Sequence, residues 1–249
     1  RAGQVILAQG AIERPMVFDG NDRPGVMMAG AAQTFLNRFG VKVGNRPVIL
    51  TSHDSAWHTA FDLADAGCKV AAIVDTRTDI APALMQAAMS RQIEVLTGHT
   101  ATATGGRLRV KSIRVNPVRG GTVGAARTIA CDAVLMCGGW TPSLHLFSHT
   151  KGSLDWDAKA KAYLPGHKTE AVHIAGAGRG LWGIAAALED GAKAGADALR
   201  DLGRKAGAAT YAVTGDRTGT GITQKELPTD RSPGSAKAFI DFQNDVTAK

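Results

Sequence analysis

The sequence is poor in cysteine and aromatic residues and has no long apolar run. Aromatic residues make up 5% of its 249 residues, and the three cysteines, Cys68, Cys131 and Cys137, show no C-x-x-C spacing. This excludes a dithiol redox pair of the thioredoxin type and an iron–sulfur cluster held by four cysteines of this chain alone. We expect buried free thiols. A membrane span, which needs about 18 consecutive apolar residues, is not expected either.

Charged residues are not gathered into blocks of one sign, although the formal net charge is +7. Scattered lysines and arginines favour a solvated surface over nucleic-acid binding, and a basic surface can also meet an acidic partner subunit. The sequence opens at Arg1 with no initiator methionine or signal peptide, and it stops inside a patterned segment. We therefore expect an internal part of a longer cytoplasmic protein.

Glycine and apolar residues are plentiful, and they alternate in a strand–helix pattern. Residues 47–50 and 70–74 predict strands on either side of a helix over 56–64, and the connection is long enough to make these strands parallel. Further strands are expected at 4–8, 94–97, 133–136 and 172–175, further helices at 27–39, 82–92 and 181–202, a β-meander with strands at 108–110 and 113–115, a loop region over 140–170 and a linker over 203–235.

The order of these elements resembles the two-dinucleotide-domain oxidoreductases of the glutathione and thioredoxin reductase type. The expected fold class is α/β, FAD/NAD(P)-binding and Rossmann-like, with a second dinucleotide-type domain inserted into part of a first and carrying a β-meander. We predict part of the first domain over 1–43, the inserted domain over 44–139, the return to the first domain over 140–202, and a linker with the start of a further domain over 203–249.

Two predicted strands end in small residues where that type of enzyme approaches its cofactor. Ala8-Gln9-Gly10 stands where it carries Ala-Thr-Gly, and Ala175-Gly176-Ala177-Gly178 where it carries Ala-Gly-Asp. The aspartate is replaced, but backbone amides and a helix dipole remain. We predict that the two segments lie side by side and that the Gly176 turn offers free amides to a cofactor; a purely structural turn is the alternative. The candidate cofactor-binding residues are Ala8, Gln9, Gly10, Ala175, Gly176, Ala177, Gly178, Trp182 and Gly183.

The loop Thr51-Ser52-His53-Asp54-Ser55-Ala56 stands where thioredoxin reductases carry Gly-Gly-Gly-Asp-Ser-Ala. The glycines that permit a tight turn and close approach of a pyrophosphate are replaced by residues with side chains. We therefore predict a dinucleotide-type turn that binds no dinucleotide, and we expect Asp75 to be a solvated acid at a strand end. His53 and His58 are five residues apart and do not share a helix face. No catalytic residue and no metal ligand is assigned.

Two longer stretches are similar to signatures of the alpha subunits of heterotetrameric sarcosine oxidases. The first is Gly10-Ala11-Ile12-Glu13-Arg14-Pro15 followed by Asn21-Asp22-Arg23-Pro24-Gly25-Val26-Met27. The second is Lys237-Ala238-Phe239-Ile240-Asp241-Phe242-Gln243-Asn244-Asp245-Val246-Thr247, which looks like the junction into the folate-binding, aminomethyltransferase-like domain of that subunit. The resemblance covers nearly the whole chain and includes Asp54-Ser55-Ala56.

The resemblance implies cofactors and partners for a full complex. NAD would bind the alpha subunit, FAD would bind the beta subunit, and FMN would lie between the two. Tetrahydrofolate would bind the adjoining domain, and gamma and delta subunits would complete the assembly. Sarcosine, oxygen and tetrahydrofolate would give glycine, peroxide and methylenetetrahydrofolate, and this piece alone would have no oxidase activity. The alternatives are the large subunit of a related amine, opine or proline dehydrogenase and a non-catalytic scaffold that holds partner subunits.

Overall fold

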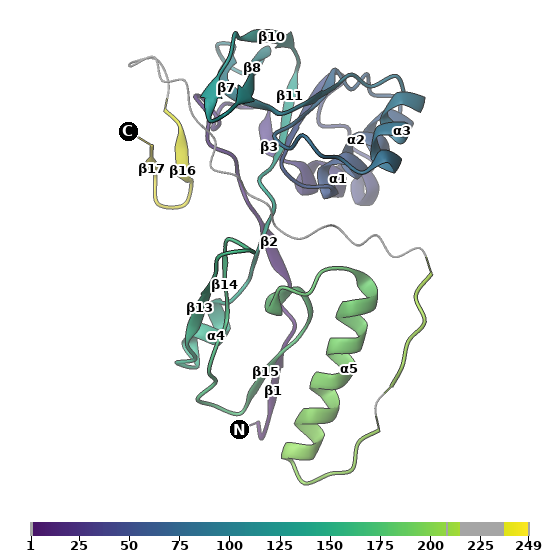
Figure 1. Cartoon of the computed structure of the whole chain (residues 1–249), viewed down its shortest axis with the longest axis vertical. Helices are drawn as coiled ribbons and strands as arrows, with labels where there is room; N and C mark the ends of the chain where they lie inside the picture. Colours follow the sequence, from purple (N-terminus) through teal and green to yellow (C-terminus); the bar gives the residue numbers. More distant parts are fainter. Residues whose placement is uncertain (1, 208, 215–236, 249) are drawn as a thin grey trace. The chain divides into compact units, whose positions relative to one another are not determined.

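The computed structural model describes residues 2–207, 209–214 and 237–248, which form two compact units (Figure 1). Of the described residues, 2–12, 140–207 and 209–214 form the small unit, and 13–139 and 237–248 form the large unit. The chain therefore passes between the units at 12–13 and again at 139–140. The predicted boundary between residues 43 and 44 lies elsewhere, because the strand and helix over 26–39 belong to the sheet and core of the large unit.

The large unit is built on a five-stranded parallel sheet in the order β3-β11-β4-β5-β6. Its strands are β3 (Val26–Met28), β4 (Pro47–Thr51), β5 (Ala72–Asp75), β6 (Val95–Thr97) and β11 (Ala133–Cys137). Three helices pack on one face of this sheet: α1 (Ala29–Phe39), α2 (Ser55–Asp65) and α3 (Pro82–Ser90) (Figure 1). The sequence β4–α2–β5 is the predicted parallel β-α-β unit.

An antiparallel sheet covers the other face of the parallel sheet. Its strands are β7 (His99–Gly105), β8 (Ser112–Arg119), β9 (Thr122–Val123) and β10 (Arg127–Ala130), with β8 between β7 and β10. Alternate strand residues face the two layers: Ile49 packs with the helix side, while Val48 and Leu50 pack with the antiparallel side. Since both faces are buried, the central strands read as continuous apolar runs rather than alternating ones.

The small unit contains two parallel strands, β1 (Val5–Leu7) and β15 (Val172–Ile174), and the long helix α5 (Ile184–Asp201). Its other elements are α4 (His145–His149), the hairpin β13 (Leu154–Asp157) and β14 (Ala162–Pro165), the 3₁₀ turn η1 (Gly176–Arg179), and β12 (Trp140–Pro142), which pairs with β2 (Ala11–Glu13). Leu7, Phe147 and Val172 form its buried apolar cluster.

A short hairpin near the end of the chain, β16 (Phe239–Asp241) and β17 (Val246–Thr247), docks on the large unit. The Asn21 side chain, 2% exposed, donates to the carbonyls of Phe239 (2.8 Å) and Met16 (3.0 Å) and accepts from the Phe239 amide (2.9 Å). Because one carboxamide satisfies both backbone groups of Phe239, Asn21 acts as a clamp on this hairpin.

Most predicted elements are confirmed, and three regions are corrected. The helix predicted from residue 27 begins at Ala29, because Met27 and Met28 belong to β3. The linker predicted over 203–235 lies mostly outside the described residues. Residues 108–110 are not a strand: they lie in the connection after Gly106, and Leu108 is 82% exposed. Before β8 in the chain, the strand that pairs with it is instead β7, whose threonines and alanines gave no apolar signal. Residues 140–170, predicted as loop, contain β12, α4, β13 and β14. The three cysteines are free and buried, as expected.

Candidate functional site

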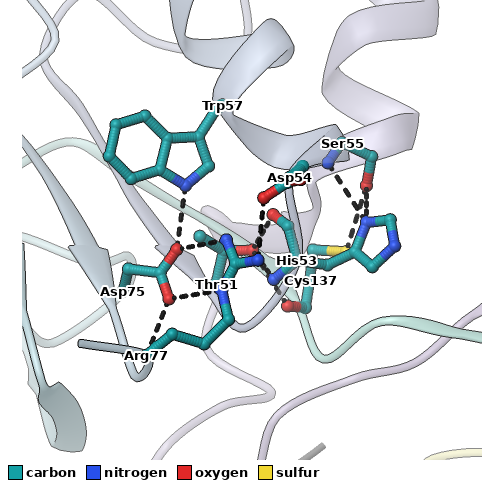
Figure 2. Close-up of polar contacts among 8 residues, drawn as sticks. All are labelled: Thr51, His53, Asp54, Ser55, Trp57, Asp75, Arg77 and Cys137. Carbon is teal, nitrogen blue, oxygen red and sulfur yellow. Dashed lines mark hydrogen bonds and ion pairs between the residues drawn. The ribbon is translucent and has the colours of Figure 1, made fainter. Parts of the chain in front are cut away.

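The first candidate site lies at the carboxyl ends of β4, β5 and β11, the edge at which open parallel sheets bind ligands (Figure 2). The loop from Thr51 to Ser55 joins β4 to α2 here. The residues that replace the glycines are turned inward, since Thr51, Ser52 and His53 are 0%, 2% and 5% exposed. Their side chains therefore fill the space that a glycine loop would leave for a ligand.

These side chains also bind the amides of the loop. Thr51 Oγ1 accepts a hydrogen bond from the His53 amide (2.9 Å), and His53 Nδ1 accepts one from the Ser55 amide (3.1 Å). Because a backbone N–H can only donate, Nδ1 carries a lone pair and the ring proton sits on Nε2. Two backbone donors that a pyrophosphate would require are thus already bound to the protein's own side chains.

Asp75, at the end of β5, is a correction: it is 0% exposed, not solvated. Its carboxylate accepts from Trp57 Nε1 (2.8 Å), from the Arg77 amide (2.8 Å) and from Arg77 Nε (3.0 Å) and Nη2 (2.7 Å). These four donors fill a carboxylate, which offers about four lone-pair sites. An acid at this position of a dinucleotide fold can bind a ribose hydroxyl, but Asp75 has no acceptor left for one.

Arg77 joins the two sides of this edge. Its Nη1 donates to Asp54 Oδ1 at 2.7 Å, so the guanidinium bridges the end of β5 and the start of α2 (Figure 2). Burial lowers the pKa of this guanidinium, but the hydrogen bonds and charges of Asp75 and Asp54 outweigh it and hold the pKa above its ordinary value. The cation stays charged, and it sits between two carboxylates at the edge where a nucleotide would enter.

A third carboxylate, Glu13, occupies the beginning of α1. Glu13 Oε2 accepts from the Gly30 amide at 2.9 Å, and the Glu13 carboxylate also accepts from the thiol of Cys137. Burial raises the pKa of Glu13 despite these two hydrogen bonds, and burial together with the Glu13 charge raises the pKa of Cys137 to about 12. Sequence reasoning gave Glu13 and Arg77 no role in a site; their side chains close the edge only because the fold brings 13, 30, 54, 75 and 77 together.

The second candidate site is the turn region of the small unit. The prediction that its two segments lie side by side is confirmed: β1 and β15 are parallel neighbours with Leu7 opposite Ile174, and the Ala175 amide donates to the Leu7 carbonyl at 2.9 Å. A Cβ on Gly178 would lie 3.8 Å from the Gly10 carbonyl oxygen. Gly10 itself, at φ +72°, has open space where a Cβ would stand.

The role predicted for the amide of Gly176 is wrong. This amide donates to Asp190 Oδ2 at 2.8 Å, so it is not free for an anion. Asp190 comes from α5, is 6% exposed, and also pairs with Arg179. In addition, α5 begins only at Ile184, with Gly183 as its N-cap, and residues 176–179 form a separate 3₁₀ turn. Gly176, at φ +68°, therefore pins the turn to the helix.

The remaining predicted residues surround this turn. Ala8 and Gln9 are exposed after β1, Ala175 is buried, and Ala177 and Trp182 are half-buried. Among the residues that the structure describes, no group of three or more His, Cys, Asp or Glu side chains is placed to hold a metal ion. Within the same residues, none of the helices has the length and apolar character needed to cross a bilayer.

The sequence is similar along its whole length to sarcosine oxidase alpha subunits. It is 39% identical over 249 residues to the alpha subunit of Rhizobium meliloti (strain 1021), and the aligned region covers 100% of this chain and 24% of the relative. Identity with the alpha subunit of Corynebacterium sp. (strain P-1) is 35% over 253 residues, covering 99% of this chain and 26% of the relative. An opine oxidase subunit from Agrobacterium tumefaciens (strain Ach5) is 30% identical over 223 residues, 80% of this chain and 43% of the relative. The chain thus spans about a quarter of the length of the sarcosine oxidase relatives.

Solved structures share the fold at low sequence identity. Thioredoxin reductase from T. acidophilum matches with a TM-score of 0.64 at 18% identity, over 81% of this chain and 66% of that one. L-proline dehydrogenase from P. horikoshii matches with a TM-score of 0.56 at 20% identity, over 82% of this chain and 36% of that one. The expected FAD/NAD(P)-binding fold class is therefore confirmed. No protein-family model matches the sequence.

Proposed function

We propose that this chain, a homologue of part of the sarcosine oxidase alpha subunit, belongs to a flavin- and dinucleotide-dependent oxidoreductase that oxidises a small amine. Similarity over the whole length of the chain, together with the FAD/NAD(P)-binding fold, supports this proposal. In the full complex the reaction would be oxidative demethylation of sarcosine to glycine, with formation of peroxide and methylenetetrahydrofolate. The beta, gamma and delta subunits would be the partners, and the adjoining domain would bind tetrahydrofolate.

Within this chain the two units have different roles. The large unit serves as a scaffold whose dinucleotide edge is closed by its own side chains. The observation that carries this role is the Asp75 carboxylate, which has four donors from Trp57 and Arg77 and 0% exposure. The catalytic flavins, FAD and FMN, would be held outside this chain, so oxidase activity requires the partner subunits.

The small unit contributes the rim of an NAD site in the full subunit. Ala8 to Gly10 and the turn from Ala175 to Gly178 are adjacent at the carboxyl ends of two parallel strands, which is where a dinucleotide lies in this fold. Gly10 and Gly178 provide the close approach of backbone, while Gly176 shapes the turn. Trp182 and Gly183 stand next to it, before α5.

The test combines the cofactor content of the full-length subunit with the activity of the chain alone. NAD should copurify with, or titrate into, the full-length subunit with one site, and replacing Gly10 by valine should reduce its occupancy. Purified chain given sarcosine should release no peroxide above a buffer blank. Sarcosine-dependent peroxide from the chain alone, or full NAD occupancy after the Gly10 change, would contradict the proposed roles.

A second candidate function is supported by the 30% identity to the opine oxidase of Agrobacterium tumefaciens. The full protein would then oxidise an opine or a related secondary amine and would not need folate. Comparing sarcosine with opines as substrates of the assembled complex distinguishes the two. Dependence of product formation on tetrahydrofolate favours the sarcosine oxidase reaction.

A further inference from the structure

The small unit contains a groove of about 280 Å³ that runs along β15 and is walled on one side by α5. None of its lining residues comes from Ala8–Gly10, Ala175–Gly178 or Thr51–Ala56, although Ile174 and Arg179 flank the Ala175–Gly178 turn, so the groove adjoins that turn. We propose that this groove, the β15 groove, is a binding site for a small organic monocarboxylate, and that Arg179 and Lys168 bind the carboxylate.

The walls of the β15 groove combine apolar side chains with cations. Phe147 and Val172, each 2% exposed, and Ile174 contribute apolar surface from the core of the small unit. Lys168 and Arg179 line the same groove. The lining is mostly polar, with one small apolar patch, and it suits a small ligand that has a compact apolar body and one charged end.

Charge selects a monoanion. The groove is lined by three cations, Lys168, Arg179 and Lys193, and by the carboxylates Asp190 and Asp197. Asp190 is paired with Arg179, and Asp197 lies 3.7 Å from Lys193. Lys168 lies 4.0 Å from Asp201, whose carboxylate is also hydrogen-bonded to His173 at 3.0 Å. With Asp201 and with Arg200, which also pairs with Asp197, four positive and three negative charges leave a net charge of +1, which one carboxylate neutralises and a phosphate dianion would overcompensate.

Arg179 is held in place for this role. Asp190, with 7% of its side chain exposed, binds one N–H group of the guanidinium and at the same time the Gly176 amide. A guanidinium carries five N–H donors, so further donors remain for a ligand, and 44% of the Arg179 side chain is exposed. A donor fixed in advance loses less side-chain entropy when the ligand binds.

The size of the groove limits the ligand to a compact one. At about 280 Å³ it lies just below the range of about 300–1,000 Å³ that is usual for drug-sized ligands. A branched-chain or aromatic monocarboxylate fits this volume, whereas a dinucleotide does not. The groove is therefore too small to be the site of the proposed NAD cofactor.

The experiment is a titration of the ¹⁵N-labelled chain with benzoate, followed by amide chemical shifts. Benzylamine serves as a probe of similar size and opposite charge to benzoate, and inorganic phosphate serves as a probe with a higher negative charge. The variant is Lys168→Glu, which changes the net charge of the groove from +1 to −1. The matched control is Lys159→Glu, the same charge change on an exposed residue between β13 and β14.

Benzoate is expected to shift the amides of Val172, Ile174 and Arg179 in a saturable way, with benzylamine and phosphate binding at least tenfold more weakly. Lys168→Glu should weaken benzoate binding about tenfold or more, because the sign of the local charge is reversed. Lys159→Glu should leave the affinity for benzoate within about twofold of the parent value. The proposal is overturned if benzoate does not saturate at these amides, if phosphate or benzylamine binds as tightly, or if the two variants behave alike.

Discussion

Replacing Arg77 by alanine removes three charge-assisted hydrogen bonds, two to Asp75 and one to Asp54. The Asp75 carboxylate, 0% exposed, is left with two donors, Trp57 Nε1 and the backbone amide of residue 77, both at 2.8 Å. Removing one partner of a buried ion pair costs about 3–5 kcal/mol. Because two donors survive, we expect a loss near the lower end, about 3 kcal/mol of the free energy of unfolding.

The assay is urea-induced unfolding at neutral pH, followed by tryptophan fluorescence. The control is Arg127→Ala, since Arg127 makes two similar bonds, of 2.6 and 2.8 Å, to Glu94 between side chains that are 54% and 42% exposed. Solvent screens the exposed Arg127–Glu94 ion pair, so Arg127→Ala should change the urea midpoint of unfolding little.

A second substitution identifies the origin of the cost. Asp75→Asn in the Arg77→Ala background removes the uncompensated charge and should recover part of the lost stability. The reasoning is refuted if Arg77→Ala is no more destabilising than Arg127→Ala. It is also refuted if the double variant recovers nothing, because the buried charge would then not be the cause.

Three further changes test the other contacts. Glu13→Gln keeps an acceptor for the Gly30 amide but removes a carboxyl whose pKa burial raises above its ordinary 4.5. The folded state holds that proton more tightly, so the stability contributed at low pH is lost as the pH rises through the folded pKa. In urea titrations, the free energy of unfolding of the variant should therefore rise relative to that of the parent between pH 4.5 and neutrality. Parallel pH profiles of the two proteins would contradict this. Asn21→Ala removes three hydrogen bonds of about 1 kcal/mol each and should speed hydrogen exchange at the Phe239 amide. Unchanged protection of this amide would rule out the clamp. Gly176→Val places a β-branched residue at φ +68° and should lower the free energy of unfolding by about 1–3 kcal/mol. The NAD occupancy of the folded full-length subunit should stay unchanged. Lower occupancy at unchanged stability would restore a binding role for the Gly176 amide.

The layered core of the large unit was predictable because its signals are local. Helical spacing over 56–64 and apolar runs at 47–50 and 133–136 identify α2, β4 and β11, and these runs are apolar because both sheet faces are covered. The small unit was harder to predict. Its hairpin β13–β14 is short and mostly exposed, with Trp156 at 56% and Tyr163 at 53%, so no alternation of buried and solvated residues marks it.

The absence of an open nucleotide edge was predictable only in part. Loss of the glycines between 51 and 53 indicated a turn that cannot approach a pyrophosphate, but nothing local showed what fills the space. Arg77 follows Asp75 by two residues, and its guanidinium also reaches Asp54, 23 positions earlier in the chain. Asp190 gave a weak signal, an acid within an alanine-rich helix, yet its partner is the amide of a glycine 14 residues away. Both contacts depend on packing between elements, which spacing in the sequence does not encode.

The large unit has a dinucleotide-type fold whose nucleotide edge is closed by Thr51, His53, Asp75 and Arg77. The most direct test is titration of the ¹⁵N-labelled chain with NAD and with FAD, observing the amides of His53, Ser55 and Arg77. No saturable shift is expected at these amides, because each already donates to a side chain of the protein: His53 to Thr51, Ser55 to His53, and Arg77 to Asp75. Saturable shifts at all three with either dinucleotide would contradict it.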